Sequence, residues 1–145
     1  MSTISFFISG IPTGQGRART KIIPGKNGKP FAMHYTPAKT EKAQTCLLAQ
    51  ALQYRPETPI TTPLRLDWVA VFPVPMSWNL RRRAAALQGA PHTGKPDRDN
   101  LDKLILDALT GPFFTDDKLV FGGTITKRYG AVAGVQITLT WAEDA

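Results

Sequence analysis

The chain has 145 residues, of which 42% are hydrophobic and 20% charged, and this composition excludes a disordered or low-complexity protein. We expect a single folded domain over residues 1–145. The longest apolar stretch, residues 66–76, is shorter than the roughly 20 residues that span a bilayer and contains two prolines. Residues 1–10 lack the pattern of a secretory signal, so we expect a cytoplasmic protein that does not associate with a membrane.

The formal net charge is +7, and the two signs are separated along the chain. Positions 1–96 hold thirteen basic and three acidic residues, whereas positions 97–145 hold five basic and eight acidic residues. A basic first part attracts polyanions such as nucleic acid. Six of the eleven acidic residues lie close together in the second part: Asp97, Asp99, Asp102, Asp107, Asp116 and Asp117. A solvated helix face is the alternative explanation of such a cluster.

The first part of the chain predicts a strand followed by a basic ribbon. Residues 4–11 are mostly apolar or β-branched and end near a glycine and a proline, which indicates an N-terminal strand. Residues 14–37 are rich in glycine, proline and basic side chains. We expect a hairpin turn at residues 25–28 between extended segments at 21–23 and 30–35. The segment is therefore a basic loop or ribbon.

A helix and a strand are predicted next. Thr36 or Thr40 is placed to cap a helix that runs to about Tyr54, whose apolar residues recur at helical spacing and should cover a sheet. In residues 64–72, large apolar side chains alternate with a second set that includes Arg65 and Asp67. This is the period of a strand with one more apolar face.

Two further helices are expected in the second part of the chain. A short helix over residues 77–87, capped by Ser77, carries three consecutive arginines. Asp99 or Asn100 is the expected cap of a longer helix with one apolar stripe, and a glycine and a proline at 111–112 end it.

The last predicted elements are strands over residues 120–127 and 132–141, joined by a turn at 129–130. We expect these two strands to pair as a hairpin. The order of all the elements suits an α+β fold, a two-layer sandwich in which a small mixed sheet has helices packed on one face.

Asp97 and Asp99 place two carboxylates two positions apart, at the start of the longer predicted helix. An extended backbone entering that helix projects both side chains toward the same side. Mg²⁺ and Mn²⁺ prefer carboxylate oxygens, and Mg²⁺ is usually held by one or two protein carboxylates together with water and phosphate. The pair therefore predicts a metal site. The structural alternative is that Asp99 is only an N-cap, with Asp102 completing a capping arrangement.

The surrounding charges favour the metal site. Helical spacing puts Asp99, Lys103 and Asp107 on one face, opposite the apolar stripe, so that Lys103 projects toward the two carboxylates. After the glycine-proline turn, Asp116 and Asp117 can return toward the same ion. In an extended segment only one of these two neighbours points inward.

Metal-bound carboxylates that are surrounded by basic side chains are suited to the hydrolysis of a phosphodiester. A divalent ion lowers the pKa of a bound water and offsets the charge that develops on the leaving oxygen. Lys103 is placed either to stabilise the transition state or to protonate the leaving group.

Three short motifs follow one another between residues 95 and 117. They are KPDRDNLDK at 95–103, DAL at 107–109 and, after a glycine-containing turn, the pair Asp116-Asp117. In order and spacing they resemble the RusA family of Holliday junction resolvases, common in bacteria and their prophages. Looser agreement covers an opening strand, a basic loop, a central strand and a closing hairpin.

The resemblance implies a homodimeric, Mg²⁺-dependent endonuclease, with Mn²⁺ as a possible substitute, that makes paired symmetric nicks in four-way DNA junctions. It implies that the catalytic carboxylates are Asp97, Asp99 and Asp117 and that the essential lysine is Lys103. Asp116 also occupies an acidic position of the family, so the implied metal ligands are Asp97, Asp99, Asp117 and Asp116.

Basic side chains outside the acidic motifs are the expected contacts to DNA phosphates, and binding through them should weaken steeply with salt. They are Arg17, Arg19, Lys21, Arg81, Arg82, Arg83 and Lys95.

The substrate also favours a dimer. A four-way junction has approximate two-fold symmetry, so a C2 dimer with one site in each subunit can cut two opposed strands. Two other functions remain open from the residues alone. One is a basic DNA-binding module whose acidic residues only cap a helix, and the other is a nuclease that acts on flaps, linear duplex or RNA.

Overall fold

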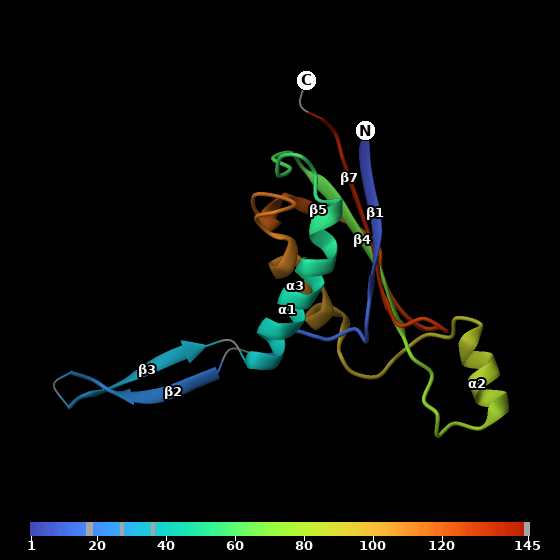
Figure 1. The fold of residues 1–145 in the computed structure, drawn as a ribbon, viewed down its shortest axis with the longest axis horizontal. Helices are drawn as coiled ribbons and strands as arrows, with labels where there is room; N and C mark the ends of the chain where they lie inside the picture. Colours follow the sequence, from blue (N-terminus) through green and yellow to red (C-terminus); the bar gives the residue numbers. More distant parts are fainter. Residues whose placement is uncertain (17–18, 27, 36, 144–145) are drawn as a thin grey trace.

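The computed structural model describes residues 1–16, 19–26, 28–35 and 37–143, which form a two-layer body with two projections (Figure 1). The elements in chain order are β1 (Ser2–Ser9), β2 (Arg19–Pro24), β3 (Pro30–Tyr35), α1 (Ala38–Ala51), the 3-10 turn η1 (Leu52–Tyr54), β4 (Leu64–Phe72), α2 (Leu80–Leu87), α3 (Arg98–Leu109), the 3-10 turn η2 (Asp117–Leu119), β5 (Val120–Gly122), β6 (Ile125–Tyr129) and β7 (Gly134–Trp141). The β2–β3 ribbon and α2 extend away from the body on different sides (Figure 1).

In the described part of the chain, five strands form one mixed sheet around β4. β7 pairs antiparallel with one edge of β4 and, on its own other side, with β1. β5 and β6 pair parallel with the first and second parts of the other edge of β4. Trp68 of β4 therefore lies between Ile137 of β7 and Ile125 of β6. The strand predicted over residues 64–72 is confirmed, and it is the centre of the sheet.

The expected hairpin between residues 120–127 and 132–141 is wrong, because β4 lies between β6 and β7. The first segment is also divided into β5 and β6 at Gly123, where a Cβ atom would overlap the carbonyl oxygen of Leu66. β6 is parallel to β4, and the chain between them makes the long crossover that a parallel pair requires. Because β4 has a neighbouring strand on each edge, this strongly apolar strand lies in the interior of the sheet.

Helices α1 and α3 cover one face of the sheet (Figure 1) and form the core with it. Leu64, Leu66 and Trp68 point from β4 into this core, and Trp68 is only 1% exposed. Burial of each large apolar side chain contributes about 1.5–3 kcal/mol to folding. The predicted apolar stripe of α3 is confirmed as its buried face, which consists of Leu101, Leu104, Ile105, Ala108 and Leu109. The structure is the α+β fold expected from the order of elements.

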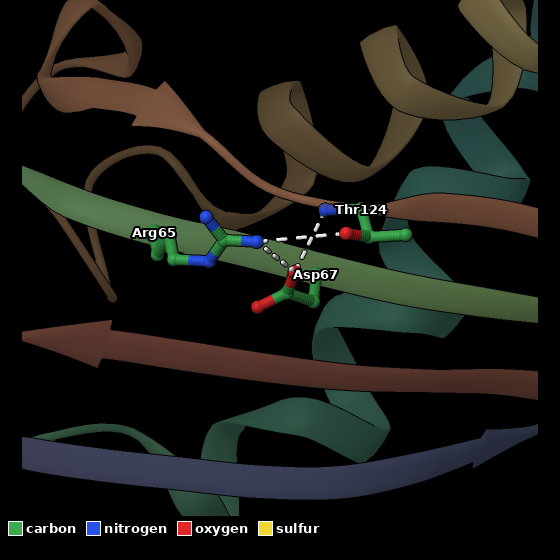
Figure 2. Close-up of polar contacts among 3 residues, drawn as sticks. All are labelled: Arg65, Asp67 and Thr124. Atoms are coloured by element: carbon green, nitrogen blue, oxygen red, sulfur yellow. Dashed lines mark hydrogen bonds and ion pairs between the residues drawn. The ribbon is translucent and has the colours of Figure 1, made fainter.

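The other face of the sheet carries the polar side chains of Arg65 and Asp67 on β4 (Figure 2). Asp67 Oδ1 accepts a hydrogen bond of 2.7 Å from the backbone N–H of Thr124 and a bond of 3.2 Å from the Arg65 guanidinium (Figure 2). The ion pair is partly exposed and therefore contributes little. The bond to Thr124 joins β4 to the break between β5 and β6.

The predicted caps of two helices are wrong. α1 begins after Pro37, and Thr40 lies buried in its first turn, where its hydroxyl accepts a hydrogen bond of 2.8 Å from the N–H of Gly16. The other proposed cap, Thr36, lies outside the described residues. α2 is capped by Asn79 and not by Ser77, because the Asn79 side chain accepts from the N–H of Arg82. Among the described residues, no helix is long and apolar enough to cross a membrane.

The predicted basic ribbon is confirmed as an antiparallel pair, β2 and β3. The turn between them is closed by hydrogen bonds from Gly25 N–H to the Lys29 carbonyl and from Gly28 N–H to the Gly25 carbonyl. A two-stranded ribbon without a third strand has little stability of its own in water. Its base is joined to the body through the segment before β2 and through the start of α1.

Candidate active site

The acidic motif surrounds the N-terminus of α3, but the helix begins earlier than expected. Asp97 occupies the N-cap position, so the predictions of Asp99 or Asn100 as the cap are wrong. The backbone of Asp97 is extended, and its carbonyl accepts the first helical hydrogen bond from Leu101 N–H at 3.1 Å. Its side chain makes no capping hydrogen bond. Helix capping therefore does not occupy the Asp97 carboxylate.

Asp99 is a residue of the first turn of α3, so the alternative in which Asp99 caps the helix with help from Asp102 is also wrong. Carboxylates in this turn are favoured by the partial positive charge of a helix N-terminus. Asp99, Lys103 and Asp107 are all exposed, as their predicted position opposite the apolar stripe requires. This face of α3 thus presents the carboxylates of Asp99 and Asp107 and the ammonium group of Lys103 to solvent.

Asp102 has a role that the sequence analysis missed. Its Oδ1 accepts a hydrogen bond of 2.9 Å from the indole N–H of Trp68, which is almost fully buried. A buried tryptophan needs a hydrogen-bond acceptor for its indole N–H. The expected burial of Trp68 was therefore a signal that a polar residue of another element accepts this bond. The bond attaches the second turn of α3 to the central strand and so fixes the helix that carries Asp97 and Asp99.

An open groove of about 720 Å³ lies beside the start of α3. One wall is the segment 11–16, which is held against the helix by a hydrogen bond of 2.9 Å from Gln15 N–H to the Asn100 carbonyl. Asp97 lines the groove together with the basic residues Lys39 and Lys95. The segment ends at Gly16, whose N–H is bonded to the Thr40 hydroxyl of α1, so the chain that leads to the basic ribbon passes beside the acidic helix terminus.

The loop before α3 is attached to the sheet by Lys127 of β6. The Lys127 ammonium group donates a hydrogen bond of 2.6 Å to the Gly94 carbonyl. His92, at the start of this loop, stacks on Phe72 with ring centroids 3.6 Å apart. Burial, and then the charge of Lys127, lower the pKa of His92 from its usual 6.5. Lys127 is a further cation near the acidic motif, and the sequence alone did not identify it.

Asp116 and Asp117 follow the compact loop at the other end of α3. Asp116 Oδ1 accepts a hydrogen bond of 2.9 Å from Lys118 N–H and so caps η2, and this bond is the main cause of the lowered pKa of Asp116. Asp117 is the exposed first residue of η2. Within the described residues of a single chain, no three side chains of histidine, cysteine, aspartate or glutamate form a group that could hold a metal ion. Asp97, Asp99 and Lys103 therefore all lie within the N-cap and first two turns of α3, and the structure does not gather Asp117 with the two carboxylates into such a group.

The basic residues expected to contact DNA lie on three parts of the structure. Lys95 lines the groove, and Lys21 lies on β2 opposite Met33. Arg81, Arg82 and Arg83 lie on α2, where the Arg82 guanidinium stacks over the Trp78 ring at 3.5 Å.

Two of the predicted DNA contacts are not placed by the structure. Arg19 opens β2 but its side chain is not described, and Arg17 lies outside the described residues. The basic side chains that are placed lie on both projections and at the groove beside the start of α3.

Comparison with known proteins identifies the family. The family model for the endodeoxyribonuclease RusA matches residues 9–140, which is nearly the whole chain. The chain is also 33% identical over 142 residues to the uncharacterized protein YqaN of Bacillus subtilis (strain 168), and the match covers 96% of each chain. The matched region includes the acidic helix terminus, the groove, the ribbon and α2. The chain belongs to the RusA endodeoxyribonuclease family.

Proposed function

We propose that the protein is a homodimeric, Mg²⁺-dependent endonuclease that resolves four-way DNA junctions by paired symmetric nicks, in DNA recombination and repair. The observation that carries this proposal is the start of α3 in a chain of the RusA family. There, Asp97 and Asp99 are not used as side-chain caps, Lys39 and Lys95 line the groove together with Asp97, and Lys103 follows Asp99 by one turn of the helix.

The donor set suits Mg²⁺, with Mn²⁺ as a substitute. Carboxylate oxygens are the ligands that these ions prefer, and Mg²⁺ needs only one or two of them when water and a substrate phosphate complete its shell. We assign Asp97 and Asp99 as the first ligands and propose Asp117, which the structure of the single chain does not gather with them, as the third. Asp116 is the weaker candidate, because one of its oxygens already caps η2. The bound ion would supply an activated water and would offset charge on the leaving oxygen.

Lys103 has a separate role in this proposal. It follows Asp99 by one helical turn on the exposed face of α3, so it lies on the same side of the helix as that carboxylate. We assign it to the scissile phosphate, where it stabilises the charge of the transition state or protonates the leaving oxygen. Trp68, through Asp102, holds the helix on which Lys103 and the carboxylates stand.

The two basic projections supply the grip on DNA in this proposal. Arg81 to Arg83 on α2 and the lysines of the ribbon would neutralise phosphates on different arms, and Lys95 would contact the strand at the groove. Two subunits related by a two-fold axis would place one acidic site on each of two opposed strands. This arrangement accounts for two cuts in one encounter.

Incubation of the purified protein with a synthetic four-way junction tests the proposal. We expect symmetric nicks with Mg²⁺ and no product with EDTA. Asp97→Asn should reduce cleavage at least 100-fold and should retain or strengthen junction binding, since it removes a charge that repels phosphate. Glu57→Gln, a carboxylate in the loop before β4, is the matched control and should cut normally.

Other results would select another function. Junction binding without cleavage in either Mg²⁺ or Mn²⁺ would indicate a DNA-binding module. Faster cleavage of a flap, a linear duplex or an RNA strand than of the junction, at equal salt, would keep the nuclease chemistry and change the substrate. Full activity of Asp97→Asn would contradict the assignment of the site.

A further inference from the structure

The ribbon exposes apolar side chains as well as basic ones. The register of β2 and β3 places Ile23 opposite Phe31 and Lys21 opposite Met33. Because side chains alternate along a strand, these four lie on one face of the ribbon. Phe31 is 52% exposed and Met33 41% exposed. Ile22 lies on the opposite face and is 69% exposed.

This exposure is unusual for a segment that projects from the body (Figure 1). A two-stranded ribbon gains little stability on its own, and clustered apolar side chains on a surface generally mark a contact with a partner. The side chains on the Phe31 face are therefore a candidate binding surface, which we call the ribbon face and define as Lys21, Ile23, Phe31 and Met33.

Charge identifies the class of partner. Residues 1–40 contain six basic residues and no acidic residue, so the ribbon is strongly cationic. A second ribbon of the same kind would repel it. The apolar pocket of the body, formed between β1, α1 and α3, is itself bordered by Lys39 and Lys42 and would also repel it. A polyanion with accessible apolar surfaces fits both properties of the ribbon.

We propose that Phe31, supported by Met33, contacts the faces of unstacked bases at the branch point of the DNA substrate. This inference rests on the proposed function and adds to it a determinant of structure specificity. In a continuous duplex the base faces are stacked and closed to side chains, whereas a branch point offers bases that unstack at low cost. Aromatic side chains stack on any base, so this contact reads the shape of the DNA and not its sequence.

The position of the ribbon connects this contact to the site of cutting. The segment that leads to the ribbon lies against the start of α3, and Gly16 is bonded to Thr40 at the start of α1. Each strand of the ribbon has six residues and spans about 20 Å. The ribbon face therefore lies within reach of a branch point whose neighbouring phosphates occupy the groove beside Asp97. The lysines supply affinity for any DNA, and the ribbon face distinguishes branched DNA.

The test compares Phe31→Ala with Ile22→Ala, an exposed apolar residue on the opposite face of the same ribbon. Binding to a four-way junction and to a linear duplex is measured in EDTA, so that cleavage does not contribute. We expect Phe31→Ala to weaken junction binding about 5- to 100-fold and duplex binding less than about twofold, as loss of one stacked base predicts. Ile22→Ala should change neither, and Phe31→Trp should retain junction binding.

A junction with 2-aminopurine at the branch point reports base unstacking directly. We expect its fluorescence to rise when the wild-type protein or Phe31→Trp binds, and to stay low with Phe31→Ala at saturating protein. Equal losses of junction and duplex affinity, or an unchanged fluorescence with the wild type, would overturn the inference. Light scattering that shows a dimer for the wild type and a monomer for Phe31→Ala would overturn it as well, because the ribbon face would then be a contact between protein subunits.

The failure of this inference is distinguishable from failure of the proposed function. A protein that binds the junction and raises the fluorescence without cutting in Mg²⁺ retains the ribbon contact and loses the nuclease assignment. A protein that cuts the junction with no change in fluorescence retains the nuclease assignment and loses the ribbon contact. Circular dichroism of each variant establishes that the fold is intact.

Discussion

The indole N–H of Trp68 donates a hydrogen bond of 2.9 Å to Asp102, and it thereby joins the central strand of the sheet to the helix of the acidic motif. The donor is buried, so loss of its acceptor leaves an unsatisfied N–H in the core. We expect Asp102→Ala to lower the free energy of unfolding by about 1–3 kcal/mol, measured by urea denaturation. The exposed Asp107→Ala on the same helix should change it by less than about 0.5 kcal/mol.

A double-mutant cycle isolates this hydrogen bond. Trp68→Phe should destabilise the Asp102→Ala variant less than it destabilises the wild type, because the variant has already lost the acceptor. Strictly additive effects of the two substitutions would show that the bond makes no net contribution.

Asp116 and Asp117 are neighbours with different surroundings. The amide oxygen that Asp116→Asn introduces can still accept the hydrogen bond from Lys118 N–H, so this variant should cut a junction within a few-fold of the wild-type rate. Asp117→Asn removes a proposed metal ligand and should lower the rate at least 100-fold. Single-turnover cleavage with saturating Mg²⁺ measures both. The opposite order of effects would assign Asp116 as the ligand.

His92 predicts a dependence of stability on pH. Its pKa is lowered in the folded protein by burial against Phe72 and by Lys127, and it returns toward 6.5 on unfolding. As the pH falls below 6.5 the unfolded chain therefore binds more protons than the folded chain, and the free energy of unfolding decreases. The stability that the folded protein gains from an uncharged His92 is fully present above pH 6.5. Urea denaturation between pH 5 and 7.5 should show a shallower decrease for His92→Phe than for the wild type.

The exposed His34, on the ribbon, provides the control for this measurement. His34→Gln should follow the wild-type pH profile, because this substitution leaves the packed ring of His92 in place. A His92→Phe profile identical to that of the wild type would exclude His92 as a source of the pH dependence.

Arg81 on α2 and Lys95 at the groove predict the salt dependence of DNA binding. Each is proposed to neutralise one phosphate, so Arg81→Ala and Lys95→Ala should each reduce the slope of log affinity against log salt by about 1. The loss of binding affinity should be similar for the junction and the duplex, whereas Phe31→Ala is expected to weaken junction binding more than duplex binding. Fluorescence anisotropy at several salt concentrations measures the slopes, and a slope equal to that of the wild type would remove that residue from the DNA interface.

The sequence predicted the elements whose signals are local. The alternation over residues 64–72 identified β4, the apolar spacing after Asp99 identified α3, and the glycines at the turn identified the ribbon. The helix caps were predicted less well. Asp97 and Asn79 take the N-cap positions, although Asp99 and Ser77 have equally suitable side chains. Cap identity depends on where the preceding loop delivers the chain, and local composition does not contain that information.

By itself the sequence determined that the chain is basic, that it carries acidic motifs in the order and spacing of the RusA family, and that Asp99, Lys103 and Asp107 share one exposed face of a helix. Only the tertiary structure decided which strands neighbour β4, which residue receives the Trp68 N–H, and that segment 11–16 lies against the start of α3. These relationships join residues far apart in the chain. They follow from burial of the whole apolar surface and from partners for buried polar groups, which no local pattern encodes.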